Sequence, residues 1–102
     1  LMQNLTPKEL SSYLKHVDVE PLFLDIRRSS EAVICCLENA EFVPVRTCSM
    51  DLFDCEQNQE IVVICQYGMR SVVVARSLEE QGYKCVINLT GGMNAWRKAM
   101  PL

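Results

Sequence analysis

Residues 61–71 of the chain, which read IVVICQYGMRS, decide the fold. The first four are apolar and β-branched, which is typical of a strand buried on both faces in a parallel sheet. A short loop containing Gly68 follows, and the pattern over 71–81 favours a helix that ends at Gly82. The stretch therefore predicts a buried strand, a tight loop and a helix in direct succession.

The same strand and helix signals recur on both sides of this stretch. A helix is expected from Thr6, which can form a capping box with Glu9. Strands or extended segments are expected at 22–26, 41–45 and 83–89, and helices from Ser29 or Ser30 to Cys36, over 47–54 and after Gly91 and Gly92. Strands that alternate with helices predict one α/β domain over 1–102 with a mainly parallel sheet.

Composition and charge exclude several classes of protein. The chain has 102 residues, of which 49% are hydrophobic and 23% charged, so a disordered chain is excluded. A net charge of −3 argues against nucleic acid and anionic membranes as partners, and no apolar run is long enough to span a bilayer. The first residues lack the pattern of a secretory signal peptide. We expect a cytoplasmic protein that binds neither nucleic acid nor membrane.

Six cysteines make a disulfide framework an alternative to consider. Cys35 and Cys36 are adjacent, and several cysteines lie inside apolar runs, where a free thiol packs as a small hydrophobic group. No C-x-x-C pair is present, so thioredoxin chemistry and zinc ribbons lack their signature. We therefore expect a reducing compartment, no metal site, core packing for Cys85, and no strong candidate for a second reacting cysteine.

The loop after the buried strand combines the features of an anion-binding and nucleophilic site. Backbone N–H groups between a strand end and a helix start point toward the centre of the loop, and the helix N-terminus adds partial positive charge. Both features favour the thiolate form of Cys65, and Arg70 adds donors for an oxyanion. A cysteine that ends an apolar strand is more often a packing residue. Here Gly68, Arg70 and the helix that begins at once favour a catalytic nucleophile.

Four segments of the chain stand in a specific order and spacing. They are LDIR at 24–27 followed by Glu31, C-x-x-G-x-R-S at 65–71, LEEQGY at 78–83 and LTGGMNAW at 89–96. Together they resemble the single-domain rhodaneses, which are thiosulfate-type sulfurtransferases. The likeness extends from the first expected helix to Trp96.

The resemblance implies an open five-stranded sheet of order 1-5-4-2-3 with helices on both faces, and a ping-pong reaction without a cofactor. In that reaction the Cys65 thiolate takes the outer sulfur of an anionic donor such as thiosulfate and becomes a persulfide. Cyanide, a thiol or a protein cysteine then accepts the sulfur. Arg70 would steer the donor and stabilise the departing group. The persulfide would be held by the loop residues Gln66, Tyr67, Gly68, Met69, Arg70 and Ser71.

Two other functions stay open. One is a small phosphatase or arsenate reductase that handles an oxyanion. Cell-cycle tyrosine phosphatases have a related fold, but their loop has one residue more between cysteine and arginine than the four found here. A binding or regulatory module is the other alternative, because CCLENA at 35–40 departs from the Gly-His-Ile-Pro-Gly-Ala segment of most rhodaneses. That segment precedes its strand and should lie far from Cys65, so we expect an intact active loop.

Residues that flank the loop are expected to support it. Asp25 and Arg27 could shape the pocket directly. The favoured alternative is a structural role in which a buried Asp25 holds loop backbone and Arg27 pairs with Glu31. Tyr67 and Met69 are expected at the mouth of the pocket, where they would bias the choice of acceptor. Surface, turn or packing roles are expected for His16, Arg28, Thr90, Gly91 and Trp96.

Overall fold

Five strands in the described part of the chain form one parallel sheet. The computed structural model describes residues 2–28, 41–42 and 56–99. The strands are β1 (Gln3–Leu5), β2 (Leu22–Asp25), β3 (Glu41–Phe42), β4 (Glu60–Ile64) and β5 (Cys85–Leu89). Their order in the sheet is β1-β5-β4-β2-β3, and every pairing is parallel. The strand order that the resemblance implied is confirmed.

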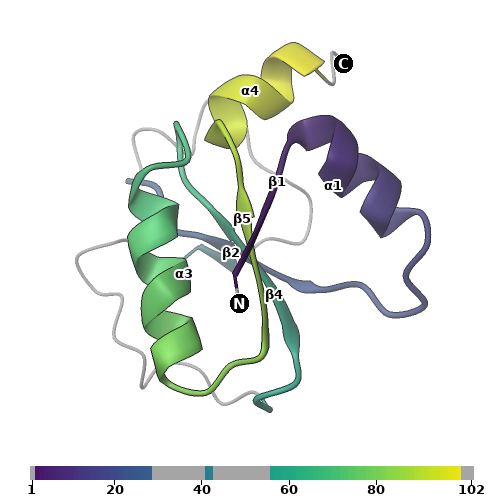
Figure 1. Ribbon diagram of the computed structural model, residues 1–102. Coiled ribbons are helices and arrows are strands. Elements are labelled where there is room, and N and C mark those ends of the chain that lie inside the picture. The colour runs from purple at the N-terminus through teal and green to yellow at the C-terminus, as the bar shows by residue number, and fades with distance from the viewer. Residues whose placement is uncertain (1, 29–40, 43–55, 100–102) are drawn as a thin grey trace.

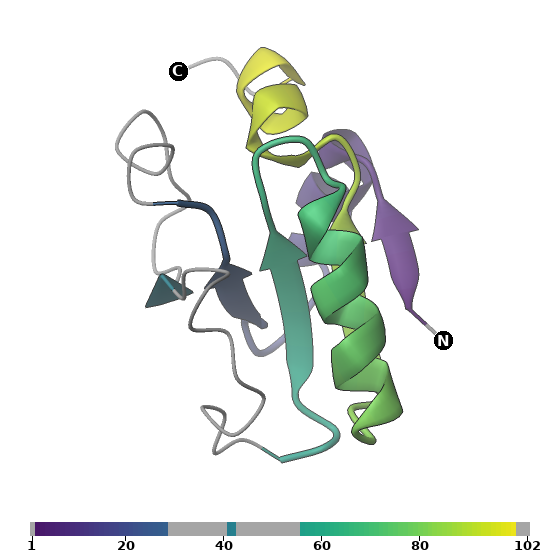
Figure 2. The ribbon, with the colours of Figure 1, turned by 90° about the vertical axis from the view of Figure 1, so that its left-hand side faces the viewer.

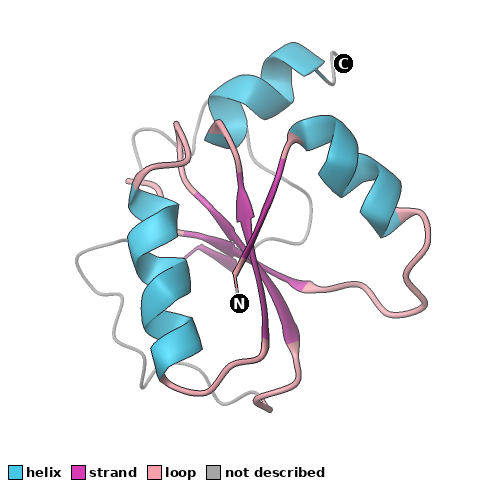
Figure 3. Cartoon of the chain, in the orientation of Figure 1, coloured by secondary structure: helices cyan, strands magenta, loops and turns pink. Residues whose placement is uncertain are grey.

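Helices cover both faces of this sheet, as Figure 1 and Figure 3 show. α3 (Arg70–Glu80) lies on one face, and α1 (Pro7–Leu14) and α4 (Gly92–Ala99) lie on the other. The turned view of Figure 2 places α4 above the loop that joins β4 to α3. The expected three-layer α/β architecture is therefore present.

β4 runs through the centre of the sheet with both of its faces buried. Ile61 and Val63 pack on the α3 side, where Leu78 is buried with them, and Val62 and Ile64 pack on the side of α1 and α4. These four β4 side chains are fully buried, and each such burial contributes about 2 kcal/mol to the stability of the fold. This two-sided burial is the physical reason for the unbroken β-branched run. It also fixes the position of the loop that follows β4.

A capping box begins α1, and a glycine ends α3. The Thr6 Oγ1 accepts the N–H of Glu9 at 3.2 Å, and a Glu9 carboxylate oxygen accepts the N–H of Thr6 at 2.9 Å. This reciprocal pair is the expected capping box of α1. At the other end of the sheet, Gly82 follows α3 with a φ of +100°, which confirms the expected glycine stop.

β5 begins later than expected, and its first residue is exposed. The N–H group of residue 83 donates to a carbonyl of α3, and that of residue 84 donates to a carbonyl in the turn before β4. Neither pairs with a neighbouring strand, so the strand starts at Cys85. The expectation that Cys85 packs in the core is wrong, because its side chain is exposed. Strand alternation places Cys85 on the same face of the sheet as the buried Ile87. Cys85 lies at the first position of β5, where it lines a surface hollow together with Gln3 and Tyr13.

Several expectations fall on residues outside the described ranges. These are the helix that ends at Cys36, the helix over 47–54, and the last part of the 41–45 segment. The same is true of Glu31 and of the cysteines at 35, 36, 48 and 55. Within the described ranges, no helix has the length and apolar character needed to cross a membrane.

Candidate functional site

The candidate site is the loop at the carboxyl end of β4, over residues 65–69. Because β2 and β5 flank β4 in a parallel sheet, the carboxyl ends of all three strands meet at this edge. α3 begins at Arg70, directly after the loop, and α4 begins just after the end of β5. Three strand ends and two helix starts therefore surround the loop, as Figure 2 shows.

The loop converges on the sulfur atom of Cys65. The N–H of Gly68 donates to Sγ at 3.0 Å, and the N–H of Ser71 donates to it at 3.3 Å. The Ser71 Oγ lies 3.1 Å from the same sulfur. The Cys65 side chain is only 1% exposed, so the sulfur lies at the bottom of the loop. Two backbone N–H groups therefore point toward the centre of the loop, where the sequence predicts such donors.

The loop closes because Gly68 adopts a conformation that side chains rarely allow. Its φ is +84°, in the left-handed region that favours glycine. A Cβ at this position would lie 2.7 Å from the backbone nitrogen of Gly91, which follows β5. Gly68 therefore serves two purposes. It turns the loop toward the sulfur, and it lets the loop contact the β5–α4 connection.

The amino end of α4 holds the outer side of the loop. The N–H of Met93 donates to the Cys65 carbonyl at 2.9 Å, and the N–H of Asn94 donates to the Gln66 carbonyl at 3.0 Å. Helix-start N–H groups have no partner within their own helix, so the loop supplies it. A Cβ on Gly92 would lie 2.3 Å from the Cys65 carbonyl oxygen. The sequence predicts a tight turn at these two glycines, and the structure adds this close approach to the loop backbone.

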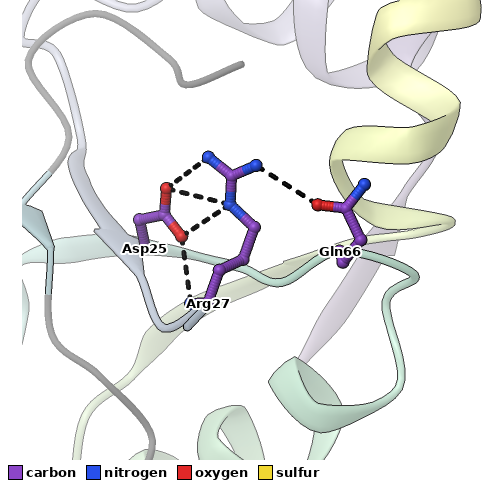
Figure 4. Close-up of polar contacts among 3 residues, drawn as sticks. All are labelled: Asp25, Arg27 and Gln66. Carbon is purple, nitrogen blue, oxygen red and sulfur yellow. Dashed lines mark hydrogen bonds and ion pairs between the residues drawn. The ribbon is translucent and has the colours of Figure 1, made fainter. Parts of the chain in front are cut away.

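A buried ion pair supports the loop from the β2 side, as Figure 4 shows. The Arg27 Nη2 lies 2.8 Å from the Asp25 Oδ2, and the Arg27 Nε and backbone N–H also donate to the Asp25 carboxylate. The Arg27 Nη1 donates to the Gln66 Oε1 at 3.3 Å. Arg27 is 0% exposed and Asp25 is 2% exposed. The Arg27 side chain thus connects Asp25 to the loop through the Gln66 side chain. Glu31, the expected partner of Arg27, lies outside the described residues.

The remaining loop side chains point outward or border α3. Tyr67 is 63% exposed and Met69 is 78% exposed, which fits their expected position at the rim. Arg70, the first residue of α3, is half-buried. Away from the loop, Arg28 and His16 are exposed and Trp96 packs against the core, in line with the structural roles expected of them.

Two asparagines near the site were not found from the sequence. Asn88 in β5 is 2% exposed, and its side chain is hydrogen-bonded to the Ser71 hydroxyl. Its amide nitrogen donates to the Oδ1 of Asn4 in β1 at 3.0 Å. The available signal was a polar residue in a strand otherwise expected to be apolar. A strand pattern alone gives no contact partner, so this signal could not be linked to the loop.

The comparisons with known proteins agree with this fold. Residues 6–99 match the Rhodanese-like domain family. The chain is 34% identical over 79 residues to the Bacillus subtilis (strain 168) protein named "Putative sulfurtransferase YtwF", covering 78% of this chain and 76% of that protein. It is 27% identical over 103 residues to a protein of Allochromatium vinosum named "Sulfurtransferase", covering 100% of this chain and 95% of that protein.

Solved structures give the same result. A Rhodanese-like domain protein from Staphylococcus aureus matches with a TM-score of 0.81 and 29% sequence identity, covering 93% of this chain and 91% of that one. Some curated relatives are longer, and the chain spans between 24% and 40% of their length. The relatives named as sulfurtransferases support a general role in sulfur transfer. On the strength of the family match over residues 6–99, the chain belongs to the rhodanese-like domain family.

Proposed function

We propose that the chain is a sulfurtransferase that moves sulfane sulfur through a persulfide on Cys65. The observation that carries the proposal is the pair of backbone N–H groups, from Gly68 and Ser71, directed at the Cys65 sulfur. These donors would stabilise the attacking thiolate and then the persulfide without any base from a side chain. The relatives named as sulfurtransferases support the same class of chemistry.

The proposed reaction balances without an oxidant, a reductant or a cofactor. The Cys65 thiolate attacks the outer sulfur of thiosulfate, a Cys65–sulfur bond forms, and sulfite leaves with the electron pair of the broken S–S bond. An acceptor thiolate or cyanide then attacks the outer sulfur of the persulfide. This second step forms the product S–S or C–S bond and returns the Cys65 thiolate. Thiosulfate stands here for anionic sulfane donors as a class, and the acceptor for thiols of small molecules or proteins.

Intact mass after incubation with thiosulfate tests this proposal. The native protein is expected to gain the mass of one sulfur atom and to lose it again when cyanide is added. Cys65→Ser is expected to gain nothing, while Cys85→Ser, which removes an exposed thiol at the far end of β5, is expected to behave as the native protein. No gain in folded native protein with thiosulfate or with a persulfide donor would contradict the proposal and favour a binding module. Turnover of an aryl phosphate that depends on Cys65 would favour a phosphatase.

Arg70→Ala is expected to lower kcat/KM for thiosulfate by about tenfold or more. A hydrogen bond to a charged group contributes about 1.5–3 kcal/mol, and about 1.4 kcal/mol corresponds to a factor of ten. The measurement is steady-state sulfur transfer to cyanide with thiosulfate as the varied substrate. Arg76→Ala is the control, because Arg76 is an exposed arginine on the same helix. Equal losses in the two variants would point to overall charge and would contradict a specific role for Arg70.

A further inference from the structure

The Asn88 side chain contacts three groups around the loop. Its Oδ1 is the partner of the Ser71 hydroxyl. Its Nδ2 lies 3.0 Å from the Asn4 Oδ1 and 3.5 Å from the Gly68 carbonyl oxygen. Gly68 and Ser71 are the same residues whose N–H groups bind the Cys65 sulfur. A single buried amide therefore touches both residues that hold the sulfur.

The partners of this amide fix the direction of the Ser71 hydroxyl. A carbonyl oxygen can only accept, so the Asn88 nitrogen must face Gly68 and the Asn88 oxygen must face Ser71. An amide oxygen also only accepts, so Ser71 gives its one hydroxyl proton to Asn88. The Ser71 oxygen then presents a lone pair to the Cys65 sulfur, 3.1 Å away. A thiol can donate its proton to that lone pair, whereas a thiolate has no proton to donate.

We propose that Asn88 is a positioning residue that acts through the Ser71 hydroxyl and favours the thiol form of Cys65. The two backbone N–H groups favour the thiolate, and the hydroxyl directed by Asn88 opposes them. When the sulfur becomes anionic, the Ser71 hydroxyl must leave Asn88 in order to donate to it. The inference rests on the proposed function only in taking Cys65 as the reacting group.

The charged and titratable groups near the loop stay the same when Asn88 is changed. In the described part of the chain they are Asp25 at the end of β2, Arg27 just after it, Tyr67 in the loop and Arg70 at the start of α3. β5 presents the neutral amide of Asn88 at its end near the loop. Replacing Asn88 by an apolar residue therefore alters the hydroxyl's partner without adding or removing a charge.

The pH dependence of Cys65 alkylation by iodoacetamide tests the proposal. The rate is followed on the peptide that contains Cys65 by mass spectrometry, so that other cysteines do not contribute. In Asn88→Leu the hydroxyl is free to donate to the sulfur, and the midpoint of the rate profile is expected to fall by about one pH unit, a tenfold change in the ratio of thiolate to thiol. Asn88→Val removes the same acceptor with a smaller side chain, and it serves if the leucine variant does not fold.

The decisive comparison is made in a Ser71→Ala background, where the hydroxyl is absent. There, Asn88→Leu is expected to cause no further shift, because Asn88 acts only through that hydroxyl. Asn58→Ala is the control, since it removes an exposed amide in the turn before β4, at the opposite end of that strand from the loop, and it should leave the midpoint unchanged. An unchanged or higher midpoint in Asn88→Leu, or an equal shift without the hydroxyl, would overturn the proposal. The assay uses no sulfur donor, so a failure of sulfur transfer is a separate result.

Discussion

Gly92→Ala is expected to lower the free energy of unfolding by about 2–5 kcal/mol. Gly92 has a φ of +61°, and placing another residue in the left-handed region costs about 1–2 kcal/mol. The new Cβ would also lie 2.3 Å from the Cys65 carbonyl oxygen and 2.6 Å from the Gln66 carbonyl carbon. Both contacts are backbone atoms, which cannot rotate away, and overpacking of this kind costs about 1–3 kcal/mol. Denaturant unfolding of native and variant proteins measures the loss.

The same substitution is expected to slow persulfide formation by about a hundredfold, because a small displacement of reacting groups has an effect of that size. The matched control is Gly82→Ala. Gly82 also has a positive φ, but the three atoms nearest to its Cβ would all belong to the flexible Gln57 side chain, at the opposite end of the sheet. The control should lose stability through its φ alone and keep its rate of persulfide formation. Equal rates in the two variants would mean that the contact between α4 and the loop does not control the sulfur.

Arg27→Met is expected to destabilise the fold by about 3–5 kcal/mol. The methionine replaces the apolar stem of the arginine but leaves the Asp25 carboxylate buried without its ion-pair partner. Removing one member of a buried pair costs this much because the remaining charge is uncompensated. Thermal and denaturant unfolding at neutral pH measure the effect.

A double substitution separates the lost pair from lost packing. Asp25→Asn combined with Arg27→Met removes both charges, so it is expected to be more stable than Arg27→Met alone. Arg28→Met is the control for the neighbouring arginine, which is exposed, and it should change stability by about 0.5 kcal/mol or less. If the double variant is no more stable than Arg27→Met, the buried charge is not the cause of the loss.

Local sequence patterns were sufficient to predict the central strand, the loop and α3. The β-branched run predicts a strand buried on both faces, Gly68 a tight loop and Gly82 a helix end. Each of these features involves only a few neighbouring residues. The strand order was not derivable from these patterns. It came from the resemblance to the rhodaneses, which rests on four segments of this chain in a specific order and spacing.

Contacts between distant segments could not be predicted in this way. The approach of Gly92 to Cys65 and the bond from Ser71 to Asn88 depend on how β5 and α4 are placed relative to the loop. The exposure of Cys85 depends on how far the covering helices extend along β5. In each case the residue type was visible in the sequence, but its neighbour was set by tertiary packing.

The parallel pairing of β1 with β5 has a consequence for how the chain folds during synthesis. Gln3 lies opposite Ile87 and Leu5 opposite Leu89. The edge strand β1 therefore cannot pair until the ribosome has synthesised β5, which lies near the other end of the domain. Pairing across so many residues is slow, because the entropy of closing the loop is lost before the contacts form. Until β1 arrives, one edge of β5 is open to other chains, and aggregation competes with folding during that interval.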